Sequence, residues 1–166
     1  MVHAVAFEPL PEGAPVLVRP LDDTEENLAI KKEFETAMAA DGLNVTVDEG
    51  RFVLSFEARE EVAAGPAPRP QTTIRFRGQG GRMSTSDERN VPKLIEGPRD
   101  GTRIYRPSRY RIDATIDDRM DGTRLWKGWA VAGLEEHTHL FLAKTMVPAI
   151  VDSIGQTVRE KPFPLQ

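Results

Sequence analysis

The longest alternation of hydrophobic and polar residues runs through residues 109–133, which contain both tryptophans of the chain. From Tyr110 to Asp117, apolar residues alternate with polar or charged ones, as is typical of a strand with one buried and one solvated face. The Asp121-Gly122 step that follows supplies the left-handed backbone that hairpin turns require. This stretch therefore predicts two long strands joined by a tight turn, around which the rest of the fold is organised.

The register of this hairpin decides which tryptophan is buried. A two-residue turn at Asp121-Gly122 places Trp129 in the core opposite Ala114, whereas a three-residue turn with Gly122 in a bulge exchanges the two faces of the second strand. We favour the two-residue turn, which leaves a smooth strip on the other face for another element or subunit to pack against. The members of this Trp126 strip are Trp126, Gly128, Ala130 and Ala132.

A strand followed by a helix is predicted in the first third of the chain. Residues 15–20 form a short apolar run closed by proline, which is typical of a buried strand. Asp23 and Glu26 are spaced as in a capping box, and apolar residues then recur at helical spacing until Asp41-Gly42 ends the helix. The apolar face of this helix consists of Ile30, Phe34, Ala37 and Met38.

The next segments predict further strands and a long loop. Residues 44–48 and 51–59 have the composition and alternation of two strands, which we interpret as a second hairpin. Residues 72–77 alternate in the same way and predict another strand. Residues 78–108 are rich in glycine and proline and have almost no periodicity, so we expect a long mobile loop there.

A second helix is predicted from Glu135 onward. Pro148 either kinks this helix or lies in the first turn of a new one that begins near Thr145. Residues 1–13 and 161–166 are expected to be an extended lead-in and an extended tail. The apolar residues at helical spacing are Leu140, Val147, Ile150, Val151, Ile154 and Val158.

Together these elements predict one α+β domain over residues 1–166, with a mixed, mostly antiparallel sheet of about five or six strands and two principal helices packed on one face. With 39% hydrophobic and 29% charged residues, a chain of 166 residues can bury a core without metal or disulfide staples. The absence of cysteine excludes thiol nucleophiles, disulfides and thiolate metal sites. We expect no transmembrane segment, because no apolar run approaches the length that spans a bilayer.

Charge is distributed unevenly along the chain. Residues 1–61 contain 14 acidic and 5 basic residues, whereas residues 69–111 contain 4 acidic and 11 basic ones. Blocks of opposite sign can neutralise each other or bind an external partner. An anion-binding site for a lipid headgroup or polyanion would centre on Arg75, Arg77 and Arg82. A nucleic-acid role is disfavoured, because few aromatic residues accompany the arginines and the chain as a whole is acidic.

The motifs that could carry chemistry are incomplete. Residues 78–81 form a glycine-rich run after a predicted strand, but no helix and no Lys-Ser or Lys-Thr pair follows, so nucleotide binding is disfavoured. His137 and His139 lack a convincing third metal ligand, and we interpret them as incidental surface histidines. The adjacent carboxylates Asp117 and Asp118 point to opposite faces of a strand. We therefore expect no catalytic residue, no metal site and no cofactor.

Four stretches together resemble small α/β domains of bacterial cell-envelope lipoproteins that assist assembly or secretion complexes of the outer membrane, including the curli-secretion type. These stretches are VLVRPLDD, the helix ending in AADGL, YRIDATIDDRMDGTRLWKGWA and MVPAIVDSIGQTV. The resemblance implies a periplasmic, non-enzymatic and often oligomeric domain. The lipidated cysteine and signal peptide of that family are absent from this sequence, so we expect that an export signal was removed.

The sequence thus predicts a non-catalytic periplasmic or cell-envelope scaffold or assembly factor that contacts a protein partner or further copies of itself. The predicted contact residues are Trp126, Gly128 and Ala130 of the strip, together with Arg111. The alternatives are an anion-binding module and a cytoplasmic location.

Overall fold

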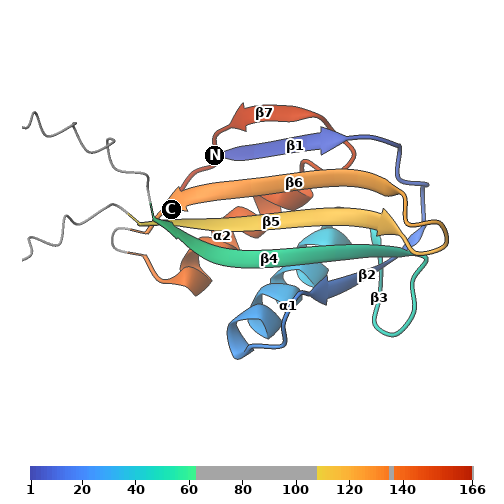
Figure 1. Ribbon diagram of the computed structural model, residues 1–166, viewed down its shortest axis with the longest axis horizontal. Helices are drawn as coiled ribbons and strands as arrows, with labels where there is room; N and C mark the ends of the chain where they lie inside the picture. Colours follow the sequence, from blue (N-terminus) through green and yellow to red (C-terminus); the bar gives the residue numbers. More distant parts are fainter. Residues whose placement is uncertain (63–107, 135–136, 166) are drawn as a thin grey trace, which may run out of the picture. The chain divides into compact units, whose positions relative to one another are not determined.

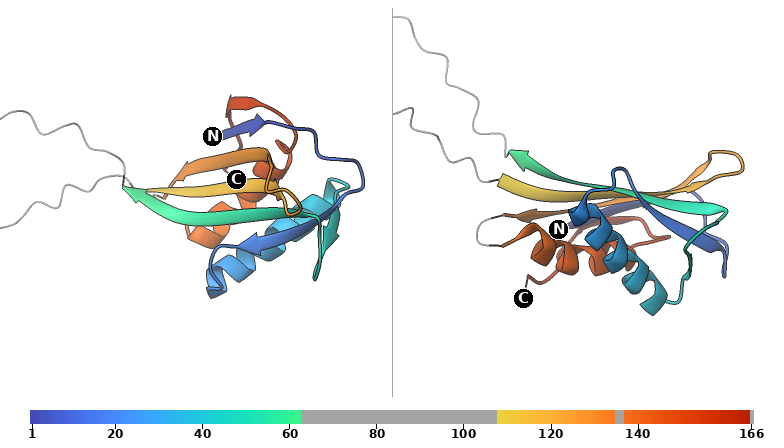
Figure 2. Two further views of the ribbon diagram at one scale, coloured as in Figure 1. Left: turned by 45° about the vertical axis from the view of Figure 1, so that its right-hand side comes forward. Right: turned by 90° about the horizontal axis from the view of Figure 1, so that it is seen from below.

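The computed structural model describes residues 1–62, 108–134 and 137–165. In these residues, seven strands form one sheet in the order β3-β2-β4-β5-β6-β1-β7, and two helices lie against one of its faces (Figures 1 and 2). The predicted α+β class is therefore confirmed. The elements are β1 (Val2–Ala6), β2 (Pro15–Pro20), α1 (Glu25–Ala40), β3 (Asn44–Thr46), β4 (Phe52–Val62), β5 (Ser108–Asp118), β6 (Arg124–Gly133), α2 (His139–Val151) and β7 (Val158–Lys161).

The sheet is parallel at one side and antiparallel elsewhere. Strand β2 pairs in parallel with β3 on one side and with β4 on the other, and the remaining neighbours are antiparallel. The predicted hairpin of residues 44–48 with 51–59 is therefore wrong, because β2 lies between the two strands. Helix α1 connects β2 to β3, and such a crossover brings the following strand back parallel to the first.

Helix α1 begins one residue later than the sequence suggested. The side chain of Thr24, and not that of Asp23, caps the helix by accepting a hydrogen bond from the backbone N–H of Asn27 at 3.3 Å. The predicted apolar face is confirmed for Ile30, Phe34 and Met38, which are fully buried against the sheet. The helix therefore packs on the sheet through its predicted apolar face, although its capping residue differs from the predicted one.

The central hairpin has the predicted strands but the opposite register. Ile116 lies opposite Trp126, whereas Asp117 lies opposite Arg124, so Leu125 is an extra residue that forms a β-bulge. Four residues, 119–122, make the turn, which is closed by a 2.8 Å hydrogen bond from Asp118 N to Thr123 O. Because a shift of one residue exchanges the two faces of a strand, the bulge brings Trp126 into the core and places Trp129 outside.

Both ends of the chain add strands to the sheet. The predicted lead-in contains β1, which pairs with β6, and β7 then pairs with β1 at the sheet edge. The predicted continuation of the second helix through Ile154 and Val158 is wrong, because α2 ends at Val151 and the chain reverses at Gly155, whose φ is +75°. Pro148 lies inside α2 without ending it.

The core lies between the helices and the inner face of the sheet. Its largest fully buried side chains include Trp126, Tyr110, Phe34 and Phe56, and the last two rings are 5.0 Å apart. Neither helix in the described residues is long and apolar enough to cross a membrane. The predicted strand 72–77, and the loop 78–108 apart from the backbone of its last residue, lie outside the described residues. The extent of the single predicted domain therefore stays a prediction.

Candidate functional site

The predicted contact strip lies in the core and not on the surface. Trp126 is 1% exposed, and its indole N–H donates a 2.9 Å hydrogen bond to the carbonyl of Ser153 beyond the end of α2. Gly128 and Ala130 are buried on the same inner face of β6. The prediction that these three residues bind a partner is therefore wrong, and its physical cause is the bulge at Leu125.

The fourth predicted contact residue, Arg111, lies on the outer face of the sheet, together with the other tryptophan, Trp129. Both helices lie on the inner side, and no helix of the described part covers the outer face (Figure 2). Arg111 and Trp129 are half-buried among the side chains of neighbouring strands. Arg111 lies on β5 and Trp129 on β6, so the central hairpin presents both residues on this face.

Trp129 is held between side chains from adjacent strands. His3 lies directly opposite it on β1, and the two rings stack at 5.0 Å between centroids with an angle of 7° between their planes. The guanidinium carbon of Arg111 is 5.4 Å from the centroid of the Trp129 ring, and the Lys127 ammonium nitrogen is 5.9 Å from it. These distances are typical of cation–π contacts. The orientation of the indole is therefore fixed before any partner binds.

Arg111 is fixed in turn by acidic neighbours. Its Nε and Nη2 atoms donate hydrogen bonds of 2.7 and 2.8 Å to the two carboxylate oxygens of Asp113. Arg59 on β4 lies 3.4 Å from the same carboxylate. The hydrogen bond to Asp113 and the charge of that carboxylate raise the pKa of the Arg111 guanidinium above its ordinary value. We call His3, Arg59, Arg111, Asp113, Lys127 and Trp129 the outer-face cluster.

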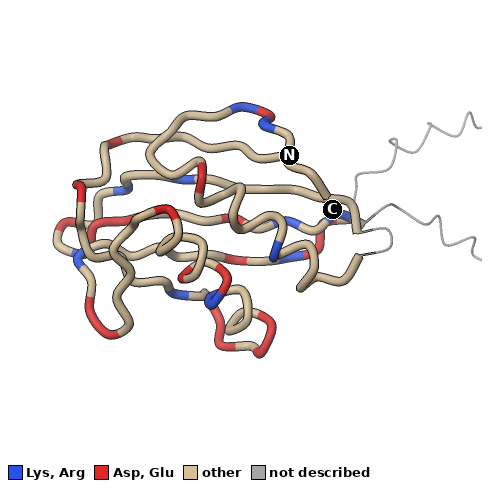
Figure 3. The backbone as a smooth tube through the Cα atoms, turned by 180° about the vertical axis from the view of Figure 1, so that it is seen from behind, with Lys and Arg blue, Asp and Glu red and all other residues tan. Residues whose placement is uncertain are grey.

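A shallow hollow of about 440 Å³ adjoins the cluster on the same face. Arg59, Asp113 and Lys127 line it, together with Asp117 and Arg124, whose side chains lie 2.8 Å apart. Both acidic and basic positions occur on the middle strands in Figure 3. Because neighbouring charges of opposite sign compensate each other here, the surface suits a mixed-charge protein face better than a highly charged polymer.

A second cluster of polar side chains links four elements at the other side of the sheet. The imidazole of His139 on α2 lies between two carboxylates, with Nδ1 3.2 Å from Glu26 of α1 and Nε2 2.8 Å from Glu60 of β4. The ring also stacks on Tyr110 of β5 at 4.7 Å, and the Tyr110 hydroxyl donates a 2.7 Å hydrogen bond to Glu26. The pKa of Tyr110 is raised, mainly because the phenol is buried and secondly because of this hydrogen bond.

No local sequence pattern predicts this second cluster, because Glu26, Glu60 and His139 are far apart in the chain. The interpretation of His139 as an incidental surface residue is wrong, since the ring connects both helices to the sheet. His137 stacks instead on Phe141, with 4.7 Å between ring centroids. Among the described residues, no group of three or more acidic or histidine side chains is arranged to hold a metal ion.

The predicted anion-binding residues Arg75, Arg77 and Arg82 lie outside the described residues. The proposed anion site therefore stays a prediction. Of the predicted site residues that the structure describes, only Arg111 is on an accessible face, and Trp129 replaces Trp126 as the aromatic residue of that face.

No family model and no curated protein matches the sequence. Two solved structures of the PelC dodecamer from Paraburkholderia phytofirmans resemble the fold at 11% identity, with TM-scores of 0.54 and 0.52. The alignments cover 94% and 95% of this chain and 98% and 99% of theirs. A PDZ domain protein from Parabacteroides distasonis resembles it at 14% identity and a TM-score of 0.59, covering 95% of this chain but 36% of that protein. At these identities the comparisons show a shared fold.

Proposed function

We propose that this chain is a non-catalytic scaffold domain of the bacterial cell envelope, and that it associates with further copies of itself through the outer-face cluster. The observation that carries the proposal is the fixed pair of Trp129 and Arg111 on the open face of the sheet. Tryptophan and arginine are among the residue types enriched at the positions that dominate binding energy in protein interfaces.

The cluster is suited to binding because its side chains are already ordered. Trp129 is stacked on His3, and Arg111 is held by both oxygens of Asp113. Association normally costs about 0.5–1.5 kcal/mol for each flexible side chain that becomes fixed. A partner that packs on this surface avoids part of that cost, which favours binding at this face.

Two observations favour another copy of the chain as the partner. The outer face contains both signs of charge, so two copies related by a two-fold axis can place basic groups of one opposite acidic groups of the other. PelC, which shares the fold over nearly its whole length, is described as a dodecamer. That assembly belongs to PelC and supports oligomerisation here as part of the proposal.

The envelope location and the non-catalytic role rest on the resemblance of the four sequence stretches described above. Fractionation of the source cells, with an antibody against the chain, tests the location. The proposal predicts the protein in the periplasmic or membrane fraction. Recovery with cytosolic marker proteins would contradict the location and leave the proposed contact surface to be judged separately.

Sedimentation analysis across a series of protein concentrations tests self-association. The wild-type chain is expected to form a species larger than a monomer, and Trp129→Ala is expected to weaken association by at least about 2 kcal/mol, or roughly thirtyfold. Arg111→Glu is expected to act in the same direction. Leu28→Ala is the control, because Leu28 is an exposed apolar residue on α1. A monomer at every concentration, or an oligomer insensitive to both outer-face variants, would refute this surface.

A further inference from the structure

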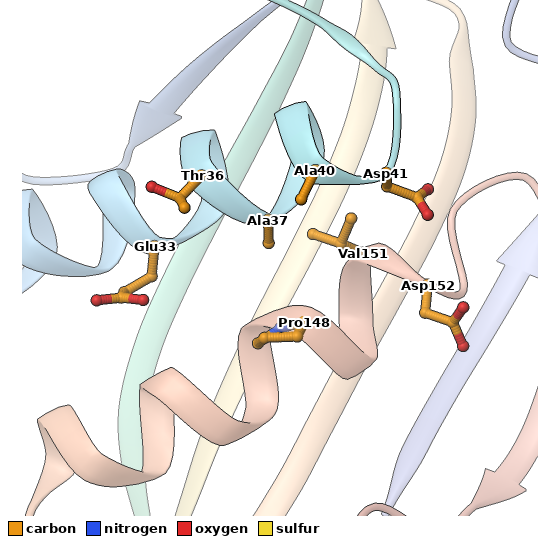
Figure 4. Close-up of a pocket in the computed structure, with 8 residues that line it drawn as sticks. All are labelled: Glu33, Thr36, Ala37, Ala40, Asp41, Pro148, Val151 and Asp152. Atoms are coloured by element: carbon orange, nitrogen blue, oxygen red, sulfur yellow. The ribbon is translucent and has the colours of Figure 1, made fainter.

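A groove lies between the two helices on the layer opposite the outer face. Its volume is about 370 Å³, near the lower end of the range for sites that take ligands or side chains. Figure 4 shows that α1 and α2 run side by side here, with small and apolar side chains between them. The floor is formed by Ala37, Ala40, Pro148 and Val151.

The ionisable side chains that line this groove are all acidic. Glu33 and Asp41 come from α1, and Asp152 follows the last turn of α2. A basic residue of the same chain, Lys161 on β7, contacts Asp152. No ion pair is seen for Glu33 or Asp41 within the described residues, whereas Glu35, which does not line the groove, is paired with Lys31 at 3.6 Å.

The ends of the helices add to this negative potential. Both helices finish at the same end of the groove, as Figure 4 shows, and Asp41 and Asp152 are their C-cap residues. Neither helix has a basic residue in its last turn. The C-terminal end of a helix carries the negative end of its dipole, where cations stabilise and anions destabilise. Asp152 is compensated by Lys161, whereas Asp41 has no ion pair within the described residues. Asp41 at the C-terminus of α1 is therefore unfavourable in the isolated domain, and a bound cationic group would relieve it.

We propose that the groove between α1 and α2 binds a basic amphipathic segment of a partner protein. An apolar side chain of the segment packs on Ala37, Ala40 and Val151, and lysine or arginine side chains on either side of it lie against Glu33 at one end of the groove and Asp41 at the other. Charge complementarity favours a basic segment over the alternatives. An acidic segment would be repelled by the groove, and an uncharged apolar segment would leave Glu33 and Asp41 without a partner of opposite charge. The proposal does not depend on self-association through the outer face.

Binding of a fluorescein-labelled helical peptide of leucine and lysine, measured by fluorescence anisotropy, tests the proposal. The double variant Glu33→Gln, Asp41→Asn is expected to bind about tenfold more weakly than the wild type, and the loss is expected to shrink as salt is raised. The matched control is Glu8→Gln, Glu12→Gln, which removes the same charge from the connection between β1 and β2. This control is expected to bind as the wild type does.

A steric variant and a second peptide complete the test. Ala40→Arg places a long basic side chain in the groove and is expected to abolish binding, while circular dichroism confirms that the variant is folded. A peptide with glutamate in place of lysine is expected not to bind. The proposal is overturned if the lysine peptide does not bind the wild type, if Ala40→Arg binds it normally, or if both double variants weaken it equally.

Discussion

The indole of Trp126 lies over Gly128, so closely that a Cβ atom at position 128 would be 2.4 Å from the ring carbons Cζ2 and Cη2. The two residues are next to each other on the inner face of β6, because side chains two apart in a strand point the same way. Any side chain at position 128 would push the ring away from the Ser153 carbonyl, to which its N–H donates. The absence of a side chain at position 128 therefore leaves the space that the Trp126 ring occupies in the core.

Gly128→Ala is expected to lower the free energy of unfolding by about 1–3 kcal/mol, because it overpacks a filled core. Denaturant unfolding followed by circular dichroism measures this loss. In a Trp126→Leu background, the same substitution is expected to cost less, since leucine lacks the two ring carbons. Equal costs in both backgrounds would show that the contact between the two residues is not the cause.

Thr46→Val is expected to raise the free energy of unfolding by about 1 kcal/mol, because it removes a buried hydroxyl and keeps the shape of the side chain. In the described part of the chain, the Thr46 hydroxyl oxygen is buried without a hydrogen-bond partner. Thr115→Val is the matched control, since the Thr115 hydroxyl donates to Asp117 at 3.3 Å and its loss brings no such gain. Thermal or denaturant unfolding that ranks Thr46→Val below the wild type would contradict the prediction.

The ion pair of Arg51 and Asp118 is expected to support the fold in acid. Arg51 donates hydrogen bonds of 3.0 and 2.8 Å to one carboxylate oxygen, and the backbone N–H of Met120 donates to the other. These bonds, led by those from Arg51, lower the pKa of Asp118 below its ordinary value. The stabilisation is therefore present above the unfolded-state pKa and is lost as the pH falls through the lower folded-state pKa.

Arg51→Gln should consequently move acid unfolding to higher pH, and an acid titration followed by circular dichroism measures the midpoint. Arg119→Gln removes a neighbouring positive charge without removing these hydrogen bonds, and it should leave the midpoint nearly unchanged. Identical midpoints for Arg51→Gln and the wild type would show that Asp118 is not held in this way.

Tyr110 should resist ionisation in alkali. Burial and the hydrogen bond to Glu26 raise its pKa, so its phenol should remain protonated where an ordinary tyrosine, with a pKa of about 10, ionises. Its contribution to stability is present below that ordinary value and is lost as the pH rises toward the higher folded-state pKa.

Absorbance titration of a Tyr105→Phe variant isolates Tyr110, because the chain has 2 tyrosines. Glu26→Gln removes the carboxylate that accepts the phenol hydrogen bond, and it is expected to move the transition to lower pH. Ionisation of Tyr110 at the ordinary tyrosine pKa in the folded Tyr105→Phe chain would contradict the described environment.

The local pattern of apolar and polar residues is sufficient to locate the long strands and the first helix. Alternation located β4 and the central hairpin, and helical spacing located α1 with its buried Phe34. Pairing between distant segments left no such signature. The short strands β1 and β7 form only because β6 and β1 offer them free edges.

The sequence predicts the wrong tryptophan for the contact surface because of one residue. A single additional residue, Leu125, exchanges the faces of β6, and the alternation of the strand is the same in either register. The sequence therefore indicated that one tryptophan is buried and the other is available for contact, but it could not indicate which. Arg111 was placed correctly on the outer face because it belongs to β5, which precedes the bulge.

The most direct test of the central claim is the accessibility of Trp129 as the protein associates. In Trp126→Phe, Trp129 is the only tryptophan, and acrylamide quenching of its fluorescence can be compared at dilute and concentrated protein. Trp129 is expected to become shielded as association proceeds, while Trp126 in Trp129→Phe is expected to be shielded at every concentration. Equal quenching of Trp129 in the monomer and the oligomer would contradict the claim that the outer-face cluster is the contact surface.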